Sequence, residues 1–167
     1  MKPIVSIIMG STSDLPVMEK AAKLLNDMQI PLEMNALSAH RTPEAVEEFS
    51  KNAAGKGIKV IIAAAGMAAA LPGVIAANTT LPVIGVPIKG AVLDGVDALH
   101  SIVQMPPGIP VATVAIDGAD NAGILAAQIL SISDEKVAEK LEKMKNNMVK
   151  EILEKDERLQ TEIWWKM

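Results

Sequence analysis

Two adjacent side chains are suited to proton transfer and anion binding. His40 and Arg41 lie in the segment Ser38–Pro43, and the chain contains only one other residue of each type. An imidazole changes charge between about pH 5 and 8, so His40 can accept and return a proton. Arg41 carries a permanent planar charge that fits a phosphate group. The pair predicts proton transfer beside a bound anion; a structural histidine and a surface arginine are the alternative interpretation.

A second polar segment, Gly10–Asp14, has the composition of a phosphate-binding loop. Its hydroxyl and backbone N–H groups come just before Pro16, and proline is typical of the first turn of a helix. Asp14 is a poor partner for phosphate but a good acceptor for ribose hydroxyls. The same residues also suit a simple turn followed by a helix cap, so this loop alone does not establish a site.

The segment Ala63–Gly73 carries almost no side-chain functionality, with the sequence AAAGMAAALPG. Small residues let the backbone approach a ligand and offer N–H donors to an anion such as a carboxylate. They also allow a dry pocket for a small neutral molecule. Close packing of a helix on a sheet would use the same residues, and both interpretations stay open.

Apolar runs rich in β-branched residues alternate with segments of helical spacing along the chain. The expected strands are Ile4–Met9, Leu32–Leu37, Ile58–Ala64, Pro82–Val86 and Pro110–Ile116. The expected helices are 16–28, 42–56, Pro72–Asn78, Val92–Val103 and Asn121–Leu130. This order predicts an α/β fold over residues 1–131, a flavodoxin-like three-layer αβα sandwich with a five-stranded parallel sheet. The three loops described above then meet beyond the carboxyl ends of the strands, where such sheets bind ligands.

The remaining segment, residues 132–167, is rich in charge and is predicted to form one long helix from Asp134. Its apolar residues recur near helical spacing: Val137, Leu141, Met144, Met148, Ile152, Leu159 and Ile163. A single apolar stripe on a protruding helix needs a partner. We therefore expect the helix to pack on a neighbouring subunit, with folding back onto its own domain as the alternative.

Composition excludes several classes of function. The 167 residues have a net charge of -4 and 2% aromatic residues, namely Phe49, Trp164 and Trp165, which argues against nucleic-acid binding and ring stacking on a flavin. Without cysteine there is no thiolate nucleophile. The uncharged run Val60–Ile88 is broken by glycine and proline, so we expect no membrane span and a cytoplasmic protein. We also expect neither metal nor cofactor, and Ala63–Gly66 lacks the aspartate of a response regulator.

Several motifs between Ile4 and Leu130 occur together and in order: Met9–Asp14, Ser38–Pro43, Leu71–Gly73, Leu81–Pro87, Ser101–Pro106, Val111–Ile116 and Asn121–Gly123. In these the chain resembles the N5-carboxyaminoimidazole ribonucleotide mutase family of purine biosynthesis. The resemblance implies transfer of a carboxylate from N5 to C4 of aminoimidazole ribonucleotide without metal or organic cofactor. It also implies decarboxylation, retention of CO2, recarboxylation at C4, and a homo-octamer that exchanges C-terminal helices.

The same resemblance assigns roles to individual residues. His40 would shuttle the proton. Substrate binding would fall to Ser11, Ser13, Asp14, Ser38, Ala39, Arg41, Gly66, Ala68, Ala69 and Leu71, the last four facing the base and its carboxylate. The chain departs from the mutase pattern at Met67, where glycine is usual, and at Ala70, where a second histidine is usual.

These departures keep other functions open. Aminoimidazole ribonucleotide carboxylases, which use CO2 directly, also lack that histidine and carry a larger residue at the position of Met67. A non-enzymatic nucleotide-binding regulator would need the phosphate loops but not His40. An assembly protein would place its function in the C-terminal helix. A related carboxylase of nickel-pincer cofactor synthesis works through a cysteine, which this chain lacks.

Overall fold

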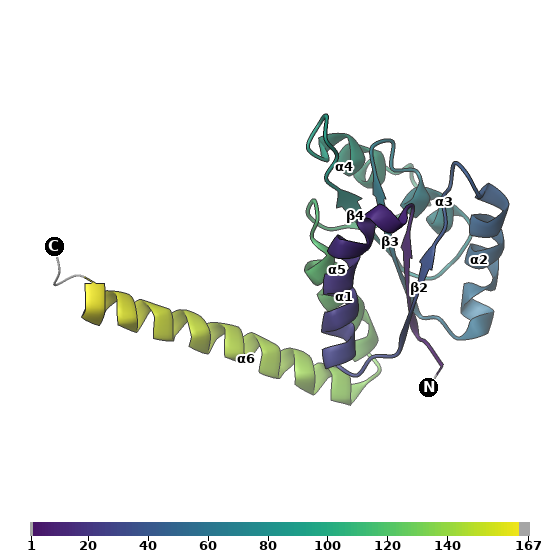
Figure 1. Ribbon diagram of the computed structural model, residues 1–167. Coiled ribbons are helices and arrows are strands. Elements are labelled where there is room, and N and C mark those ends of the chain that lie inside the picture. Colours follow the sequence, from purple (N-terminus) through teal and green to yellow (C-terminus); the bar gives the residue numbers. More distant parts are fainter. Residues whose placement is uncertain (1, 164–167) are drawn as a thin grey trace.

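Five parallel strands form the central sheet of the computed structural model, which describes residues 2–163 (Figure 1). The strands are β1 (Val5–Met9), β2 (Leu32–Ala36), β3 (Val60–Gly66), β4 (Val83–Ile88) and β5 (Ala112–Thr113). Their order in the sheet is β2-β1-β3-β4-β5, and every neighbouring pair is parallel. This is the flavodoxin-like order, so the predicted fold class is confirmed.

The described residues also form six α-helices: α1 (Leu15–Asp27), α2 (Pro43–Lys56), α3 (Leu71–Ala77), α4 (Val96–Val103), α5 (Ala119–Ser131) and α6 (Glu135–Arg158). Alternate residues of the strands point to opposite faces, so Ile7 packs with α1 and α5 while Ile8 packs with α2, α3 and α4. Two cores result, one on each face of the sheet. Figure 1 shows α1 and α5 on one side of the sheet and α2 on the other. The fully buried β1 and β4 explain the continuous apolar runs in the sequence.

Local signals explain both boundaries of α2 and the start of α6. Pro43 lies at the start of α2, and Gly57 ends that helix with a φ of 102°, a left-handed conformation that glycine adopts without steric cost. Asp134 caps α6 because its Oδ1 accepts hydrogen bonds from the backbone N–H groups of Lys136 and Val137. The helices predicted over 42–56 and from Asp134 agree with α2 and with the start of α6, which ends at Arg158.

Two predicted elements are shorter than expected. The helix predicted from Val92 begins only at Val96, because Asp94 and Gly95 have φ values of 51° and 87° that a right-handed helix excludes. The strand predicted over Pro110–Ile116 pairs only at Ala112 and Thr113. Smaller shifts of one to two residues occur at the ends of β3, α3 and β4.

Helix α6 has two environments along its length. Val137 and Leu141 are buried in the core shared with α1 and α5, so the first turns fold back onto the domain. Beyond them α6 extends away from the sandwich (Figure 1), and Met148 and Ile152 are exposed, Ile152 by 64%. Packing on a neighbouring subunit therefore stays a prediction for the outer half. Trp164 and Trp165 lie outside the described residues.

Within residues 2–163, no helix combines the length and the apolar character that crossing a membrane requires. The uncharged run noted in the sequence is divided among β3, α3 and β4.

Candidate functional site

A cavity of about 530 Å³ opens at the carboxyl edge of the sheet, where the loops after β1, β2, β3 and β4 meet. The chain order reverses between β1 and β3, which is the switch point at which doubly wound sheets bind ligands. Every residue that the sequence analysis assigned to the site lines this cavity: Ser11, Ser13, Asp14, Ser38, Ala39, His40, Arg41, Gly66, Ala68, Ala69 and Leu71.

The loop after β1 is ordered by its own hydroxyl groups. Ser11 caps a short 3-10 turn (Thr12–Asp14), and its Oγ accepts hydrogen bonds from the backbone N–H of Ser13 at 3.2 Å and from the Ser13 hydroxyl at 2.9 Å. The 3-10 turn leads directly into α1, so backbone donors and hydroxyls face the cavity at the start of a helix. This arrangement suits a phosphate or another small anion.

Asp14 lies deeper in the cavity than the two serines. The residue is only 8% exposed, and burial raises its pKa above the ordinary 3.8, because desolvation penalises the charged form. Hydrogen bonds from the Ser13 hydroxyl and the Ser11 backbone lower the pKa, and the negative charge of Asp117 raises it further. A buried carboxyl group of this kind is suited to a neutral, hydroxyl-bearing part of a ligand.

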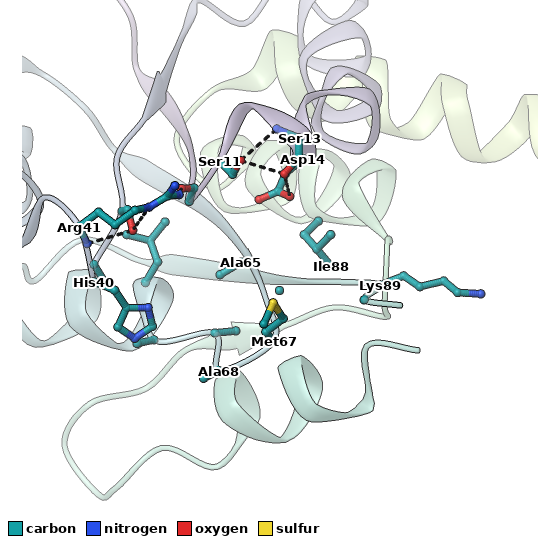
Figure 2. Close-up of a pocket in the computed structure, with 18 residues that line it drawn as sticks. Ser11, Ser13, Asp14, His40, Arg41, Ala65, Met67, Ala68, Ile88 and Lys89 are labelled. Carbon is teal, nitrogen blue, oxygen red and sulfur yellow. Dashed lines mark hydrogen bonds between the residues drawn. The ribbon is translucent and has the colours of Figure 1, made fainter. Parts of the chain in front are cut away.

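Arg41 connects the loops after β1 and β2. Its Nη2 donates to the carbonyl oxygen of Gly10 at 2.8 Å, and its Nε donates to Ser38 Oγ at 3.3 Å. Ser38 is itself held, because its backbone N–H donates to Thr42 Oγ1 at 2.9 Å. The guanidinium is therefore fixed beside the serines of the first loop (Figure 2), which gives the cavity a positively charged end.

His40 lies beside Arg41 on the rim of the cavity and is exposed to solvent. Figure 2 shows its imidazole extending from the loop on the side of the cavity where Ala68 lies. Gly66, Ala68, Ala69 and Ala70 form the floor there, with methyl groups and backbone instead of polar side chains. The site thus combines a cationic end, one titratable ring and an apolar floor.

One wall of the cavity was not predicted from the sequence. Ile88, Lys89 and Gly90, which follow or end β4, also line it. The rule that ligands bind beyond the carboxyl ends of parallel strands applies equally to this strand and was the available signal. Met67 also lines the cavity, with a φ of 56° and 70% of its side chain exposed.

Potential metal ligands do not gather in this cavity or elsewhere in the part of the chain that the structure describes. Residues 2–163 contain no group of three or more histidine, aspartate or glutamate side chains placed to hold one ion. The polar and charged side chains that line the site are those of the serines, Asp14, His40, Arg41 and Lys89.

Comparison with known proteins matches residues 4–151 to the family described as AIR carboxylase. The N5-carboxyaminoimidazole ribonucleotide mutase of Pyrococcus abyssi is 61% identical over 146 residues, which cover 87% of this chain and 84% of that protein. The phosphoribosylaminoimidazole carboxylase of Candida glabrata is 54% identical over 160 residues, 96% of this chain. The chain spans only 28% of the length of that fungal relative.

Solved structures show the same relationship at the level of the fold. The crystal structure of Treponema denticola PurE superposes with a TM-score of 0.86 at 32% sequence identity. The match covers 94% of this chain and 98% of that one, so it includes the sandwich and most of the C-terminal segment.

Proposed function

The chain belongs to the AIR carboxylase family, and from this premise we propose that it is an N5-carboxyaminoimidazole ribonucleotide mutase of purine biosynthesis. It would convert N5-carboxyaminoimidazole ribonucleotide into 4-carboxy-5-aminoimidazole ribonucleotide. The observation that carries the proposal is the position of His40 on the same cavity as Arg41 and the serines of the first loop. In this proposal His40 would act as the proton carrier next to the binding site of a sugar phosphate.

The polar end of the cavity would bind the ribose phosphate. Arg41, Ser11 and Ser13 supply a fixed cation, hydroxyls and a helix start, which together suit a phosphate dianion. Asp14 would accept hydrogen bonds from the ribose hydroxyls, with Ser38 and Ala39 completing this side. These contacts would direct the aminoimidazole ring toward Gly66, Ala68, Ala69 and Leu71.

His40 would then move one proton while the carboxyl group changes atoms. Cleavage of the N5–carboxyl bond releases CO2, and the protonated imidazole donates a proton to N5. C4 of the ring attacks the retained CO2, and the neutral imidazole removes the proton from C4. The reaction is an isomerisation without net change in protons. The apolar floor favours this transfer because it excludes water and keeps CO2 next to the ring until the two recombine.

The outer half of α6 supports a proposal about assembly. Its exposed apolar residues, among them Met148, Ile152 and Leu153, lie on the part of the helix that extends from the sandwich. We propose that a neighbouring subunit of a cytoplasmic homo-octamer covers them, with residues 1–131 as the catalytic domain and 132–167 as the exchanged extension.

Replacing His40 with asparagine tests the proton carrier. Asparagine keeps hydrogen-bonding capacity but cannot titrate, so we expect turnover to fall by about 10²–10⁴-fold while ribonucleotide binding persists. The matched control is His100→Asn, which changes the other histidine, an exposed residue of α4 outside the cavity. Full activity of His40→Asn would refute the proposed role.

The carboxyl donor is tested by supplying each substrate separately. Purified protein is incubated with N5-carboxyaminoimidazole ribonucleotide or with aminoimidazole ribonucleotide and bicarbonate, and the C4-carboxylated product is measured. The mutase proposal expects product from the first substrate at low bicarbonate. Product from the second alone would identify a direct carboxylase instead, and binding without product from either would identify a regulator.

A further inference from the structure

One wall of the cavity is hydrogen-bonded to a residue that does not itself line the cavity. Lys89 and Gly90, which follow β4, line the cavity, whereas Asp117, which follows β5, does not. Asp117 nevertheless makes two hydrogen bonds to the end of β4. Its backbone N–H donates to the carbonyl oxygen of Pro87 at 2.8 Å, and its Oδ1 accepts from the backbone N–H of Lys89 at 2.9 Å. We call residues 88–90 the β4 wall.

These two bonds extend the contact between β4 and the chain after β5 beyond the point where the β4–β5 strand pairing ends. The β4–β5 ladder ends with Gly85 opposite Thr113, and one more bond follows from Val114 N–H to the Gly85 carbonyl at 3.1 Å. The chain then turns, and Asp117 adopts a φ of 56°, a left-handed conformation that aspartate tolerates better than most residues. Its carboxylate therefore takes the place of the backbone acceptor that a longer β5 would have offered to Lys89.

The loop that follows the β4 wall is packed against the same turn. Gly95 has a φ of 87°, and a Cβ there would lie 2.8 Å from Ile116 Cγ2 and 3.1 Å from Lys89 Cα. The Lys89 ammonium pairs with Asp94 at 3.3 Å, and Figure 2 shows this side chain extending away from the other labelled residues of the cavity. Because that ion pair is largely exposed, it contributes little to holding the loop. The charge-assisted bond to Asp117 is the directed polar contact of the wall.

We propose that Asp117 is a positioning residue of the substrate cavity: its carboxylate sets the place of the β4 wall and thereby the fit of the ribonucleotide. This inference rests on the proposed function, since the ligand is the one proposed there. Asp117 would influence binding rather than proton transfer, because His40 follows β2 at the far side of β1 and β3.

Two variants of the full chain distinguish the effect of the hydrogen bond from Lys89 to Asp117 from the effect of the backbone conformation at Asp117. Asp117→Gly removes the carboxylate and accepts a positive φ without strain, whereas Asp117→Asn keeps a carbonyl acceptor and also tolerates this conformation. We expect the glycine variant to raise KM about 10-fold with kcat within about twofold, the size expected for losing one hydrogen bond to a charged group. The asparagine variant should restore KM to within about threefold of the parent.

Amide hydrogen exchange at Lys89 reports the wall directly. It should accelerate about 10-fold in Asp117→Gly and return toward the parent rate in Asp117→Asn. The control is Asp120→Gly, which removes an exposed carboxylate three residues further on, in the first turn of α5. Parental KM and parental Lys89 exchange in Asp117→Gly would overturn the inference. An inactive parent protein would instead refute the proposed function, and the exchange rates would still test the wall.

Discussion

The guanidinium of Arg41 donates from Nη2 to the carbonyl oxygen of Gly10 at 2.8 Å, across 31 positions of sequence. This bond joins the last backbone group before Ser11 to the loop that carries His40. Because a planar guanidinium is directed by its fixed donors, its remaining N–H groups have a set orientation toward the cavity. Arg41 thus joins the loops after β1 and β2 and places a positive charge between them.

We expect Arg41→Lys to weaken binding of the ribonucleotide about 10- to 100-fold, because an ammonium retains the charge but loses the planar set of donors. Calorimetric titration with the ribonucleotide and with its unphosphorylated nucleoside measures how much affinity is lost for each ligand. The penalty should fall on the phosphorylated ligand. Arg158→Lys in α6 is the control, as the only other arginine of the chain. Equal weakening of both ligands would contradict a phosphate contact.

Asp14 makes stability depend on pH in a defined direction. Its pKa is raised by burial, so the folded protein binds this proton more tightly than the unfolded chain does. The stability contributed by the neutral carboxyl is complete below the ordinary pKa of 3.8 and decreases as the pH rises through the raised pKa. Asp14→Asn removes the ionisation, so the variant should be more stable than the parent at neutral pH.

Urea denaturation at a series of pH values measures this difference. We expect the stability advantage of Asp14→Asn to shrink as the pH falls through 3.8, because the parent carboxyl becomes neutral in both the folded and the unfolded state below that pH. The same variant should bind the ribonucleotide about 10-fold more weakly, since an amide is a weaker acceptor for hydroxyls than a carboxylate. An advantage that does not vary with pH would show that ionisation of Asp14 is not its cause.

The sequence was sufficient where local chemistry decides the structure. Helix α2 was predicted over 42–56 and occurs at Pro43–Lys56, because proline at its start is a local signal. The alternation of strands and helices was sufficient to place the loops containing Ser11, His40 and Ala68 at one edge. All three line the cavity.

Features that depend on contacts between residues far apart in the sequence were harder to predict from the sequence. The pairing of β5 ends after Thr113, where the chain soon turns, although β4 continues to Ile88 and the apolar pattern of the sequence continues as well. The β4 wall was missed because Lys89 is a typical surface residue by type. Its position in the cavity depends on the bond to Asp117, which lies 28 positions away. A single sequence gives no measure of such a contact.

The apolar outer half of α6 gives a test of the proposed assembly. Ile152→Lys adds a charge to a side chain that is 64% exposed in the isolated chain, so its effect on the fold of one subunit should be small. We expect the particle mass measured by light scattering to fall, since a lysine in a subunit interface costs desolvation energy. Glu157→Gln is the control with the same change in charge on the same helix. An unchanged mass would place the interface elsewhere.

Met67 combines a strained backbone with an exposed apolar side chain on the rim of the cavity. Its φ of 56° is unfavourable for a residue with a Cβ, and 70% of the side chain is exposed. Strain of this kind persists at sites where a particular conformation serves function. We predict that the side chain limits the escape of CO2 between cleavage at N5 and attack by C4.

Met67→Gly should therefore change the fate of the carboxyl group more than the stability of the fold. Relief of the left-handed strain and the added freedom of the unfolded chain oppose each other, so we expect a net change within about 1 kcal/mol. With substrate labelled in the carboxyl carbon and unlabelled bicarbonate in solution, product from the parent should keep its label, whereas product from the variant should lose a larger fraction. Met67→Leu retains an apolar side chain and should behave as the parent. Equal retention of label in all three proteins would mean that the floor and the bound ring, rather than Met67, confine the CO2.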